Sequence, residues 1–375
     1  MKAVYWSDKN GKDEIIADEF TKEMYSYAKG DGESDTRQSR WANAITVNDG
    51  SYWVWIPRYA YSITSGYHTS TAGTIEVEFL KGKTNTSVAG RTEYAEAAGE
   101  NNWNIHPAFY YDGTSTTGTQ LAGIWVAKYE MSMEKSGAAT TTSDESIGNK
   151  SVVDNTNIKA VSKPGVTAWR YINRSNIFTN ALNYDTTSVS NANLDSHLMK
   201  NSEWGAVAYL SHSQYGINSE IYINNSSEFY TGRSGGNVGG SQNTLVTQFP
   251  DILTSSTQYN SYGYYTWTGQ AIGVDGTIGE ITDAILGIKA STTGNISGIY
   301  DMSGNVWEWC SDIFGDYHDS PQTNPKGLSP EEGEYHILRG GSCYYPSHCS
   351  RVSYREGAVS GTKNANVGFR VVCEP

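Results

Sequence analysis

Four cysteines are the residues of this chain best suited to bind a soft metal ion or to act as nucleophiles. They are Cys310, Cys343, Cys349 and Cys373, and no two of them form a C-x-x-C pair. This spacing argues against a zinc ribbon, and four cysteines in 375 residues are too few for a disulfide scaffold. Cys310 and Cys373 are expected to be buried free thiols, with a disulfide between them as the alternative.

The histidines and the glycine-rich stretches also lack the spacing of a known catalytic site. The seven histidines show no H-x-x-x-H pattern. The chain has no nucleophile elbow, no phosphate-binding loop and no Rossmann fingerprint. The residues alone therefore favour recognition over catalysis.

A polar run rich in Tyr, Arg, Ser and Asn occupies residues 343–366. Its composition is that of an antibody-like binding surface, in which Tyr and Arg make contact and Ser, Gly and Asn adapt. Large polar side chains are costly to bury without partners, and exposed Tyr and Arg are common hot spots of binding. The alternative is an ordinary polar loop. We expect six side chains to form an exposed ligand contact: Tyr344, Tyr345, His348, Arg351, Tyr354 and Arg355.

Two short strands must hold this run in place. Residues 304–309 follow a tight turn, and Trp307 and Trp309 alternate with smaller or charged residues as a buried strand requires. Residues 368–372 form a second strand. We expect both strands in one small, twisted antiparallel sheet, with a helix at 200–211 packed nearby. Two scaffold arginines, Arg339 and Arg370, are expected to pair with buried acceptors or carboxylates.

The rest of the chain is divided by composition. Residues 1–50 are polar and are expected to form an attachment or edge segment, and residues 51–375 one domain. Residues 132–159 read as a long loop, and 212–297 as an insertion of loops and short hairpins. The remaining predicted elements are strands at 4–6, 52–63 and 74–80 and helices at 18–27, 166–173 and 175–184.

Bulk composition excludes several functions. The formal net charge is −13, so nucleic acid is not an expected partner, because phosphate contacts need clustered Lys and Arg. No apolar run approaches the length of a membrane span, and the start of the sequence has no signal-peptide pattern. The 27 tyrosines, 11 tryptophans and 39 glycines suit a loop-rich fold with aromatic packing.

Three strings near the C-terminus form an ordered series: Gly-Asn-Val-Trp-Glu-Trp at 304–309, Arg-Gly-Gly-Ser at 339–342 and Gly-Phe-Arg at 368–370. The series resembles the formylglycine-generating enzyme domain of the sulfatase-modifying-factor family, a variant of the C-type lectin fold. Earlier strings fit in register at 53–57, 124–130 and 197–208. The resemblance implies an α+β fold of the C-type-lectin-like, formylglycine-generating-enzyme type, with small twisted antiparallel sheets, a few helices and long loops.

The resemblance also implies what a catalytic member would need. Its enzymes oxidise a substrate cysteine with two copper(I)-binding cysteines, which follow the Arg-Gly-Gly-Ser string with C-x4-C spacing. Here Cys343 comes directly after Ser342, and Cys349 follows with five residues between, so neither lies in the family register. We therefore expect no copper, and both cysteines in an exposed loop. The histidine triad of the iron-dependent sulfoxide synthases that share this domain also has no match.

Calcium is the metal that the resemblance favours. Asp301, Gly304, Val306 and Glu308 match one calcium site of the family, with carboxylates at the acidic positions and carbonyl oxygens at the others. Hard oxygen ligands around a turn suit this ion. The alternative is that Asp301 caps the turn and Glu308 pairs with an arginine in the core.

The 343–366 run also resembles the variable region of diversity-generating retroelement proteins, whose Asn codons near the C-terminus of a C-type lectin domain are diversified. Its Tyr, Ser, His, Cys, Arg, Gly and Asn residues are all reachable from such a codon. We therefore expect a non-catalytic protein of a phage virion or bacterial surface. It would bind a host-surface protein or glycan without inserting into a membrane, and attach to a larger assembly through residues 1–50. The alternatives are a copper oxidase of protein cysteine and a structural decoration module of a virion.

Overall fold

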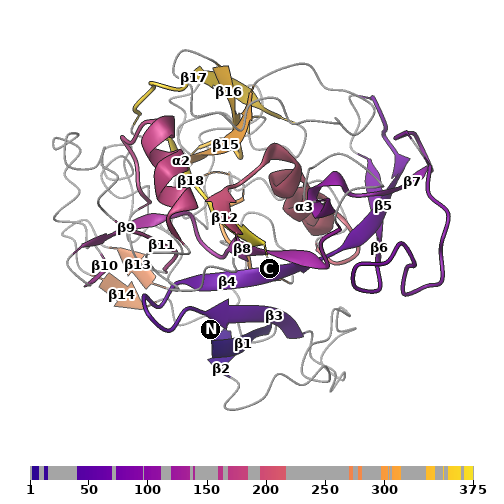
Figure 1. Ribbon diagram of the computed structural model, residues 1–375, viewed down its shortest axis with the longest axis horizontal. Coiled ribbons are helices and arrows are strands. Elements are labelled where there is room, and N and C mark those ends of the chain that lie inside the picture. Colours follow the sequence, from indigo (N-terminus) through magenta and orange to yellow (C-terminus); the bar gives the residue numbers. More distant parts are fainter. Residues whose placement is uncertain are drawn as a thin grey trace.

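The computed structural model describes about half of the chain (Figure 1). The described residues are 2–7, 12–15, 40–69, 73–95, 97–110, 120–135, 138–139, 159–163, 168–184, 195–216, 270–272, 278–280, 297–302, 304, 306–313, 335–342, 349, 354–364 and 367–374.

A seven-stranded antiparallel sheet forms the centre of the molecule, in the order β12-β19-β8-β4-β3-β1-β2. In chain order its strands are β1 Lys2–Ser7, β2 Lys12–Ile15, β3 Arg40–Ile45, β4 Tyr52–Pro57, β8 Gly123–Ala127, β12 Asp195–Leu198 and β19 Val371–Glu374. The strands before residue 50 thus extend one edge of this sheet, and β19 lies between β12 and β8.

Both faces of the central strands are buried, as their continuous apolar runs require. Neighbouring residues of a strand point to opposite faces. Val54 and Val126 pair across β4 and β8 and belong to a core that also holds Trp204. Trp53 and Ala127 pair one residue along and belong to a second core. The predicted strand at 52–63 is interrupted at Pro57, where β4 ends, as expected of a residue that lacks a backbone N–H.

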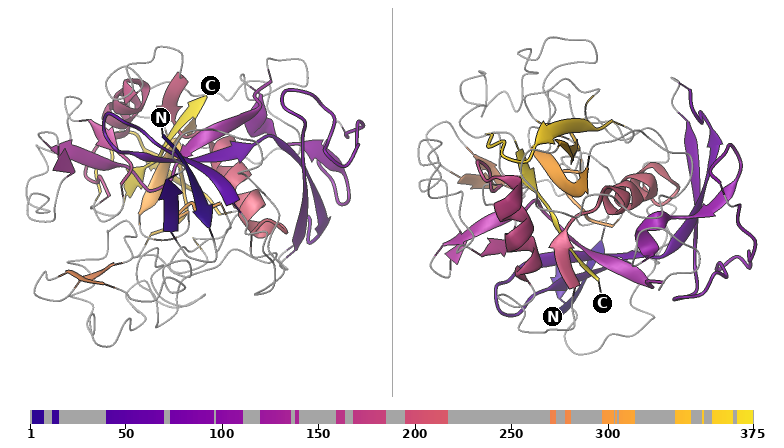
Figure 2. Two further views of the ribbon diagram at one scale, coloured as in Figure 1. Left: turned by 90° about the horizontal axis from the view of Figure 1, so that it is seen from below. Right: turned by 45° about the horizontal axis from the view of Figure 1, so that its top comes forward.

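A four-stranded sheet lies between the two described α-helices and carries the C-terminal strings (Figure 1 and Figure 2). Its order is β17-β16-β15-β18. The strands are β15 Trp307–Ile313, β16 Tyr335–Arg339, β17 Glu356–Val359 and β18 Val367–Phe369. The first and last C-terminal strings therefore share a sheet, as predicted. Their direction was predicted wrongly, because β15 and β18 run parallel, with Glu308 opposite Gly368.

The expected final strand is also divided. It breaks at Arg370, so that β18 joins the four-stranded sheet and β19 joins the seven-stranded sheet. Gly368 lets this crossing occur at close range, because a Cβ there would lie 2.9 Å from Val306 Cγ2 and 3.1 Å from the Trp169 carbonyl oxygen. Two sheets are thus joined by one residue.

Two α-helices flank the four-stranded sheet. α3 spans Asn201–His212, close to its prediction, and starts where the backbone N–H of Lys200 donates to Glu203 Oε2 at 2.7 Å. α2 spans Arg174–Leu182 and is capped by the Asn173 side chain. The predicted helix at 166–173 is wrong over 168–173, which form no helix. The predicted helix at 18–27 lies outside the described residues.

Three smaller sheets complete the described part. One has the order β6-β5-β7, formed by β5 Tyr59–Ser65, β6 Thr74–Phe79 and β7 Trp103–Ile105, and the short helix η2 Pro107–Phe109 follows it. A second consists of β9 Ser132–Lys135, β10 Ala138–Ala139 and β11 Ala160–Val161, so the loop expected from residue 132 begins with strands. The third is a hairpin of β13 Gln270–Ile272 and β14 Ile278–Glu280, inside the insertion expected to hold short hairpins.

Candidate functional site

The predicted ligand contact falls partly within the described residues. Tyr344, Tyr345, His348 and Arg351 lie outside them. Tyr354 and Arg355 are described, and both are half-buried. They lie directly before β17, at the edge of the four-stranded sheet.

Tyr354 is fixed from three directions. Its ring lies 6.0 Å from that of Trp307, and its hydroxyl donates to Glu356 Oε2 at 3.1 Å. Its carbonyl oxygen accepts a hydrogen bond from Arg339 Nη1. Burial, reinforced by Cys349 and Glu356, raises the pKa of Tyr354, so the side chain is a neutral phenol at physiological pH. The hydroxyl hydrogen is already donated to Glu356, so a ligand would meet an oriented acceptor oxygen.

Arg339 connects the segment that follows Ser342, which includes Tyr354, to the core. It ends β16, and its guanidinium carbon lies 4.1 Å from the centre of the Trp204 ring of α3. The next two residues, Gly340 and Gly341, both have positive φ, at 85° and 69°. A Cβ at Gly340 would lie 2.9 Å from the Met302 carbonyl oxygen. The Arg-Gly-Gly string thus anchors the start of the segment on α3.

The cysteines differ from expectation in one respect. Cys349 is only 3% exposed, so it is not an exposed loop residue, and its burial raises the pKa of the thiol. Cys310 and Cys373 are buried free thiols, and they belong to separate cores, which argues against a disulfide between them. Burial also raises the pKa of Cys310. Cys343 lies outside the described residues.

A buried cluster of acidic groups surrounds the residues predicted to bind calcium. Glu308 Oε1 accepts from Arg370 Nε at 2.9 Å and from Nη2 at 2.6 Å. Arg370 is fully buried and also donates to the carbonyl oxygens of Ala127 and Tyr300, at 2.7 and 2.8 Å. This is the pairing predicted from the sequence as the alternative to calcium, in which Glu308 pairs with an arginine in the core. Glu308 Oε2 is buried and has no hydrogen-bond partner in the described part of the chain.

Glu130 belongs to the same cluster and was not identified from the sequence. It is fully buried at the end of the strand region around β8, and Glu130 Oε1 accepts from the backbone N–H of Val306 at 3.2 Å. Burial raises its pKa well above the usual range, with further increases from Asp301 and Glu308 that Arg370 opposes. Three carboxyl groups therefore lie close together, and Arg370 is paired with one of them, Glu308. Only long-range packing brings Glu130 here, so no local pattern could have found it.

The turn between these acids is shaped by backbone conformation. Asp301 has a φ of 58° and Gly304 a φ of 88°, both in the left-handed region. The Gly304 N–H donates to the Gly340 carbonyl oxygen at 2.7 Å, which connects the turn to the Arg-Gly-Gly string. All four predicted calcium residues are buried. The candidate cation site is therefore connected, through the Arg-Gly-Gly string, to the start of the segment predicted to contact a ligand.

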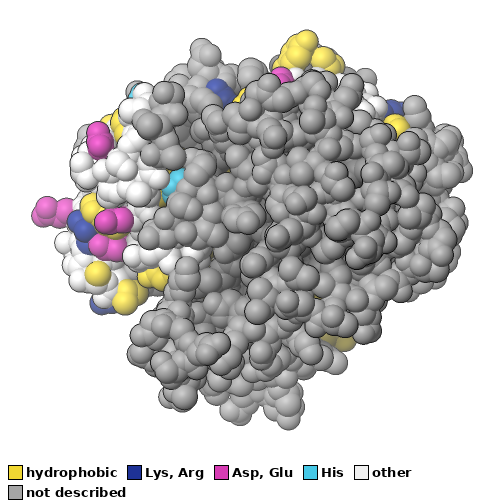
Figure 3. All heavy atoms as spheres, turned by 180° about the vertical axis from the view of Figure 1, so that it is seen from behind, with side chains coloured by type: hydrophobic (Ala, Val, Ile, Leu, Met, Phe, Trp, Pro, Cys, Tyr) yellow, Lys and Arg dark blue, Asp and Glu magenta, His cyan; other side chains and the backbone are white. Residues whose placement is uncertain are grey.

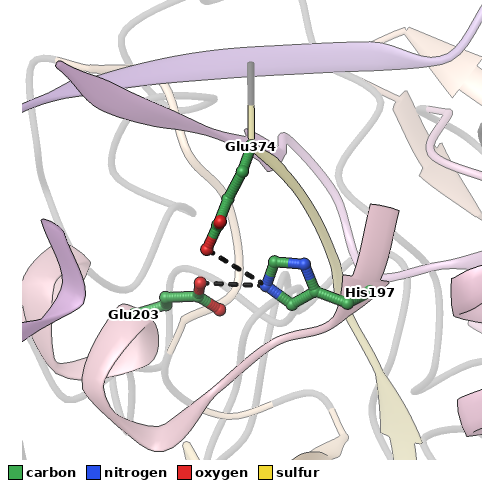
Figure 4. Close-up of side chains that lie close together, drawn as sticks. All are labelled: His197, Glu203 and Glu374. Carbon is green, nitrogen blue, oxygen red and sulfur yellow. Dashed lines mark hydrogen bonds and ion pairs between the residues drawn. The ribbon is translucent and has the colours of Figure 1, made fainter. Parts of the chain in front are cut away.

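A second buried ionic cluster lies between β12, the start of α3 and β19 (Figure 4). His197 Nε2 lies 2.9 Å from Glu203 Oε1 and 3.9 Å from Glu374 Oε1. The atoms of this trio are close enough to hold a metal ion. However, Lys200 Nζ lies among them, 2.6 Å from Glu374 Oε1 and 3.3 Å from Glu203 Oε1. The ammonium group supplies the positive charge that a metal would otherwise provide.

The described surface carries charges of both signs side by side. Figure 3 shows acidic and basic side chains intermixed at one edge of the molecule. The exposed charged residues of the β5–β7 region include Glu76, Lys81, Lys83 and Glu93. Neither described helix is long and apolar enough to span a membrane.

Comparison with known families gives one extensive match. The model of the sulfatase-modifying factor enzyme 1-like domain matches residues 87–375. Two curated relatives match over short regions. The formylglycine-generating enzyme of Streptomyces coelicolor is 41% identical over 81 residues, which cover 20% of this chain and 25% of that protein. Serine/threonine-protein kinase Pkn1 of Chlamydia trachomatis is 38% identical over 82 residues, covering 21% of this chain and 13% of that protein.

Solved structures match over longer regions at low identity. PvdO from Pseudomonas aeruginosa has a TM-score of 0.43 and 12% identity, over 89% of this chain and 98% of that one. Treponema denticola variable protein 1 has a TM-score of 0.31 and 13% identity, over 89% of this chain and 99% of that one.

Proposed function

This chain belongs to the family of sulfatase-modifying factor enzyme 1-like domains, and from that premise we propose that it is a non-catalytic ligand-binding member of the family. The predicted fold class is confirmed: small, mostly antiparallel sheets with two described α-helices, in the C-type-lectin-like form of the formylglycine-generating enzymes. Within that fold, the recognition surface is the segment between Ser342 and Val367.

The observation that carries this proposal is the way the segment is held. Arg339 is stacked on Trp204 and binds the carbonyl oxygen of Tyr354, while the side chains of Tyr354 and Arg355 remain half-exposed. Rigid aromatic and arginine groups on a fixed support lose little conformational freedom on binding. The scaffold can therefore stay constant while the contact residues of the segment vary.

The cysteines support a non-catalytic reading. Cys349 is buried, and its pKa is raised by that burial, so little reactive thiolate is present at neutral pH. Its spacing from Cys343 also differs from the family's copper-binding pair. The sequence similarity to named formylglycine-generating enzymes favours a copper oxidase as the second candidate, although the chain spans only 25% of the Streptomyces protein.

We further propose that the ligand lies on a host-cell surface, as a protein or glycan, and that the chain is part of a phage virion or a bacterial surface. The Tyr, Ser, His, Cys, Arg, Gly and Asn residues of 343–366, all reachable from a diversified Asn codon, support this assignment. Attachment to the larger assembly would use the segment before residue 50, whose strands β1 and β2 lie at one end of the seven-stranded sheet, with β2 outermost among the described strands.

We also propose one structural calcium ion beside the turn at 301–308. The fit is chemical: the buried carboxyl groups of Glu130, Asp301 and Glu308 lie close enough to raise the pKa of Glu130, and only Glu308 is paired with Arg370. Asp301 and Glu308 would bind the ion through carboxylates, and Gly304 and Val306 through carbonyl oxygens. Hard oxygen donors of this kind suit calcium. The ion would neutralise the excess negative charge and stabilise the turn.

The binding proposal is tested with the fluorescently labelled full chain on bacterial cells and on an array of bacterial surface glycans. Tyr354→Ala and Arg355→Ala should each weaken binding by about 1 kcal/mol or more, or at least about fivefold, and Tm is measured alongside because the Tyr354 ring packs against Trp307. Lys81→Ala, on an exposed turn far along the chain from the segment, is the matched control. Unchanged binding in both contact variants would move the binding face elsewhere.

The enzyme alternative is tested separately. The chain is incubated with copper(I) and a cysteine-containing peptide, and the peptide is analysed by mass spectrometry for conversion to formylglycine. The proposal expects no conversion. Conversion that disappears in Cys343→Ser or Cys349→Ser would establish the oxidase instead.

A further inference from the structure

The buried ionic cluster of Figure 4 joins three elements that are distant in sequence. His197 comes from the edge strand β12, Glu203 from the first turn of α3, and Glu374 from β19. Lys200, at the start of α3, binds both glutamates. These contacts fasten β12 and β19 to α3, and β19 in turn pairs with β8 in the middle of the seven-stranded sheet.

When Glu203 and Glu374 are both ionised, the charges of this cluster balance only if His197 is protonated. Two carboxylates, Glu203 and Glu374, face the Lys200 ammonium and the imidazole at distances of 2.6 to 3.9 Å. A protonated imidazole gives two positive and two negative charges. A neutral imidazole leaves one buried carboxylate charge without a compensating cation, which is costly in a site shielded from water.

We propose that His197 is a proton-dependent latch that fastens β12 and the C-terminal strand β19 to helix α3. Protonation completes the charge balance and tightens the three elements. Loss of the proton weakens the contact between α3 and the strands. Glu374 lies on β19, the strand that follows β18 and Arg370, so the latch acts on the support of the recognition segment.

The groups around His197 favour its protonated form, as the latch requires. Burial alone would lower the pKa of His197, but Glu203 and Glu374 outweigh burial and the opposing charge of Lys200, so its pKa is raised. On the same strand, Asp195 Oδ1 lies 4.0 Å from His197 Nδ1 and adds a further negative group. The pKa of Glu203 is lowered to about 2 in spite of its burial, because His197 and Lys200 favour its ionised form.

Two other carboxyl groups titrate near the latch. Burial raises the pKa of Glu374, against the opposing charges of Lys200 and His197. Asp312, on β15, accepts from the Asn201 N–H at 2.6 Å and has a pKa raised by burial. Variants of His197 separate its contribution from these carboxyls.

The sign of the pH dependence follows from the raised pKa. A histidine stabilised in its charged form contributes fully below its unfolded pKa of about 6.5. That contribution is lost as pH rises through the folded pKa. The latch should therefore weaken as pH rises from about 6.5 through the folded pKa, at a cost of about 3 °C in Tm for each unit by which the pKa is raised.

The experiment compares thermal unfolding of the full chain between pH 6 and 9 with that of two variants. His197→Gln removes the titrating group, and His68→Gln removes an exposed histidine as a control. The proposal expects the wild-type chain and His68→Gln to lose Tm in parallel as pH rises, and the His197→Gln curve to be flatter by several degrees. A His197→Gln curve parallel to the wild type would overturn the latch.

Two further measurements do not depend on that comparison. Histidine NMR titration should place the pKa of His197 above about 6.5, and a value at or below the ordinary one would refute the proposal. Hydrogen exchange in β12 and β19, corrected for the intrinsic pH dependence of exchange, should show less protection at pH 9 than at pH 6 in the wild type. His197→Arg, which keeps a permanent positive charge, should remove this difference.

Discussion

Replacing Arg370 with methionine should be among the most damaging single changes in this protein. The side chain is fully buried and makes four hydrogen bonds, two to Glu308 Oε1 and one each to the carbonyl oxygens of Ala127 and Tyr300. Methionine has a similar length and fills much of the space, so Arg370→Met tests the charge and the hydrogen bonds more than the packing.

The size of the stability loss follows from the buried groups that lose their partner when Arg370 is replaced. Breaking a buried ion pair by removing one partner costs about 3–5 kcal/mol, because a buried charge remains uncompensated. Each carbonyl oxygen that loses its donor adds about 1 kcal/mol or more. Arg370→Met should therefore lower the free energy of unfolding by about 5 kcal/mol or more, a large fraction of the stability of a typical domain.

A double variant separates charge from hydrogen bonding. Arg370→Met combined with Glu308→Leu removes both charges. The free energy of unfolding of this double variant should therefore be about 3 kcal/mol higher than that of Arg370→Met alone. The half-exposed pair of Arg91 and Glu78, at 2.9 Å, provides the control. Arg91→Met should cost only about 1 kcal/mol or less, because surface ion pairs are screened by solvent.

The assay is urea unfolding followed by tryptophan fluorescence, at fixed calcium and with chelator in parallel. A loss in Arg370→Met no larger than that in Arg91→Met would refute the reasoning. So would a double variant less stable than Arg370→Met, because the buried carboxylate of Glu308 would then not be the source of the cost.

Two other predictions concern the turn and the crossing between sheets. Chelation should lower the Tm of the wild-type chain by several degrees, because an ion that binds only the folded state stabilises it by mass action. Asp301→Ala should remove this response. A wild-type Tm that does not change with chelator would refute the calcium site. Gly368→Ala should cost about 1–3 kcal/mol in urea unfolding, since its Cβ would lie 2.9 Å from Val306 Cγ2 and 3.1 Å from the Trp169 carbonyl oxygen. Gly361→Ala, where a Cβ meets nothing within 4 Å, should be nearly neutral, and equal losses in the two variants would contradict the argument.

The elements with a strong local pattern were predictable from the sequence. The alternation of Trp307 and Trp309 matches β15, and the apolar face with Trp204 matches α3. Arg370 was expected to pair with a buried carboxylate, and Glu308 is its partner. Each of these predictions rests on residues whose neighbours along the chain already limit where they can lie.

The errors arose where distant packing decides the outcome. Ala168, Trp169 and Ile172 are spaced like one face of a helix, but they enter the core from an irregular segment. Its backbone is bonded elsewhere: Trp169 N–H donates to Met131 and Tyr171 N–H to Asn364. Tyr171 also has a φ of 58°, which a right-handed helix excludes.

Strand direction and the acidic cluster also depend on contacts far along the chain. The parallel pairing of β15 with β18 is set by the crossing at Arg370, which no local pattern records. The proximity of Glu130 to Asp301 and Glu308 likewise follows from the packing of β8 against the turn. The sequence could therefore identify most scaffold residues of the site, but not all of their neighbours.

The position of β19 has a consequence for how the chain is made. This strand lies between β12 and β8, inside the largest sheet, yet it is translated after the recognition segment. Synthesis proceeds from the N-terminus, so the sheet cannot be completed by β19 until the ribosome has translated that segment. A frameshift or stop codon within the segment would remove β19 and leave β12 without its partner. Only genes whose segment preserves the reading frame would yield the complete sheet, so folding of the scaffold would itself depend on an intact segment.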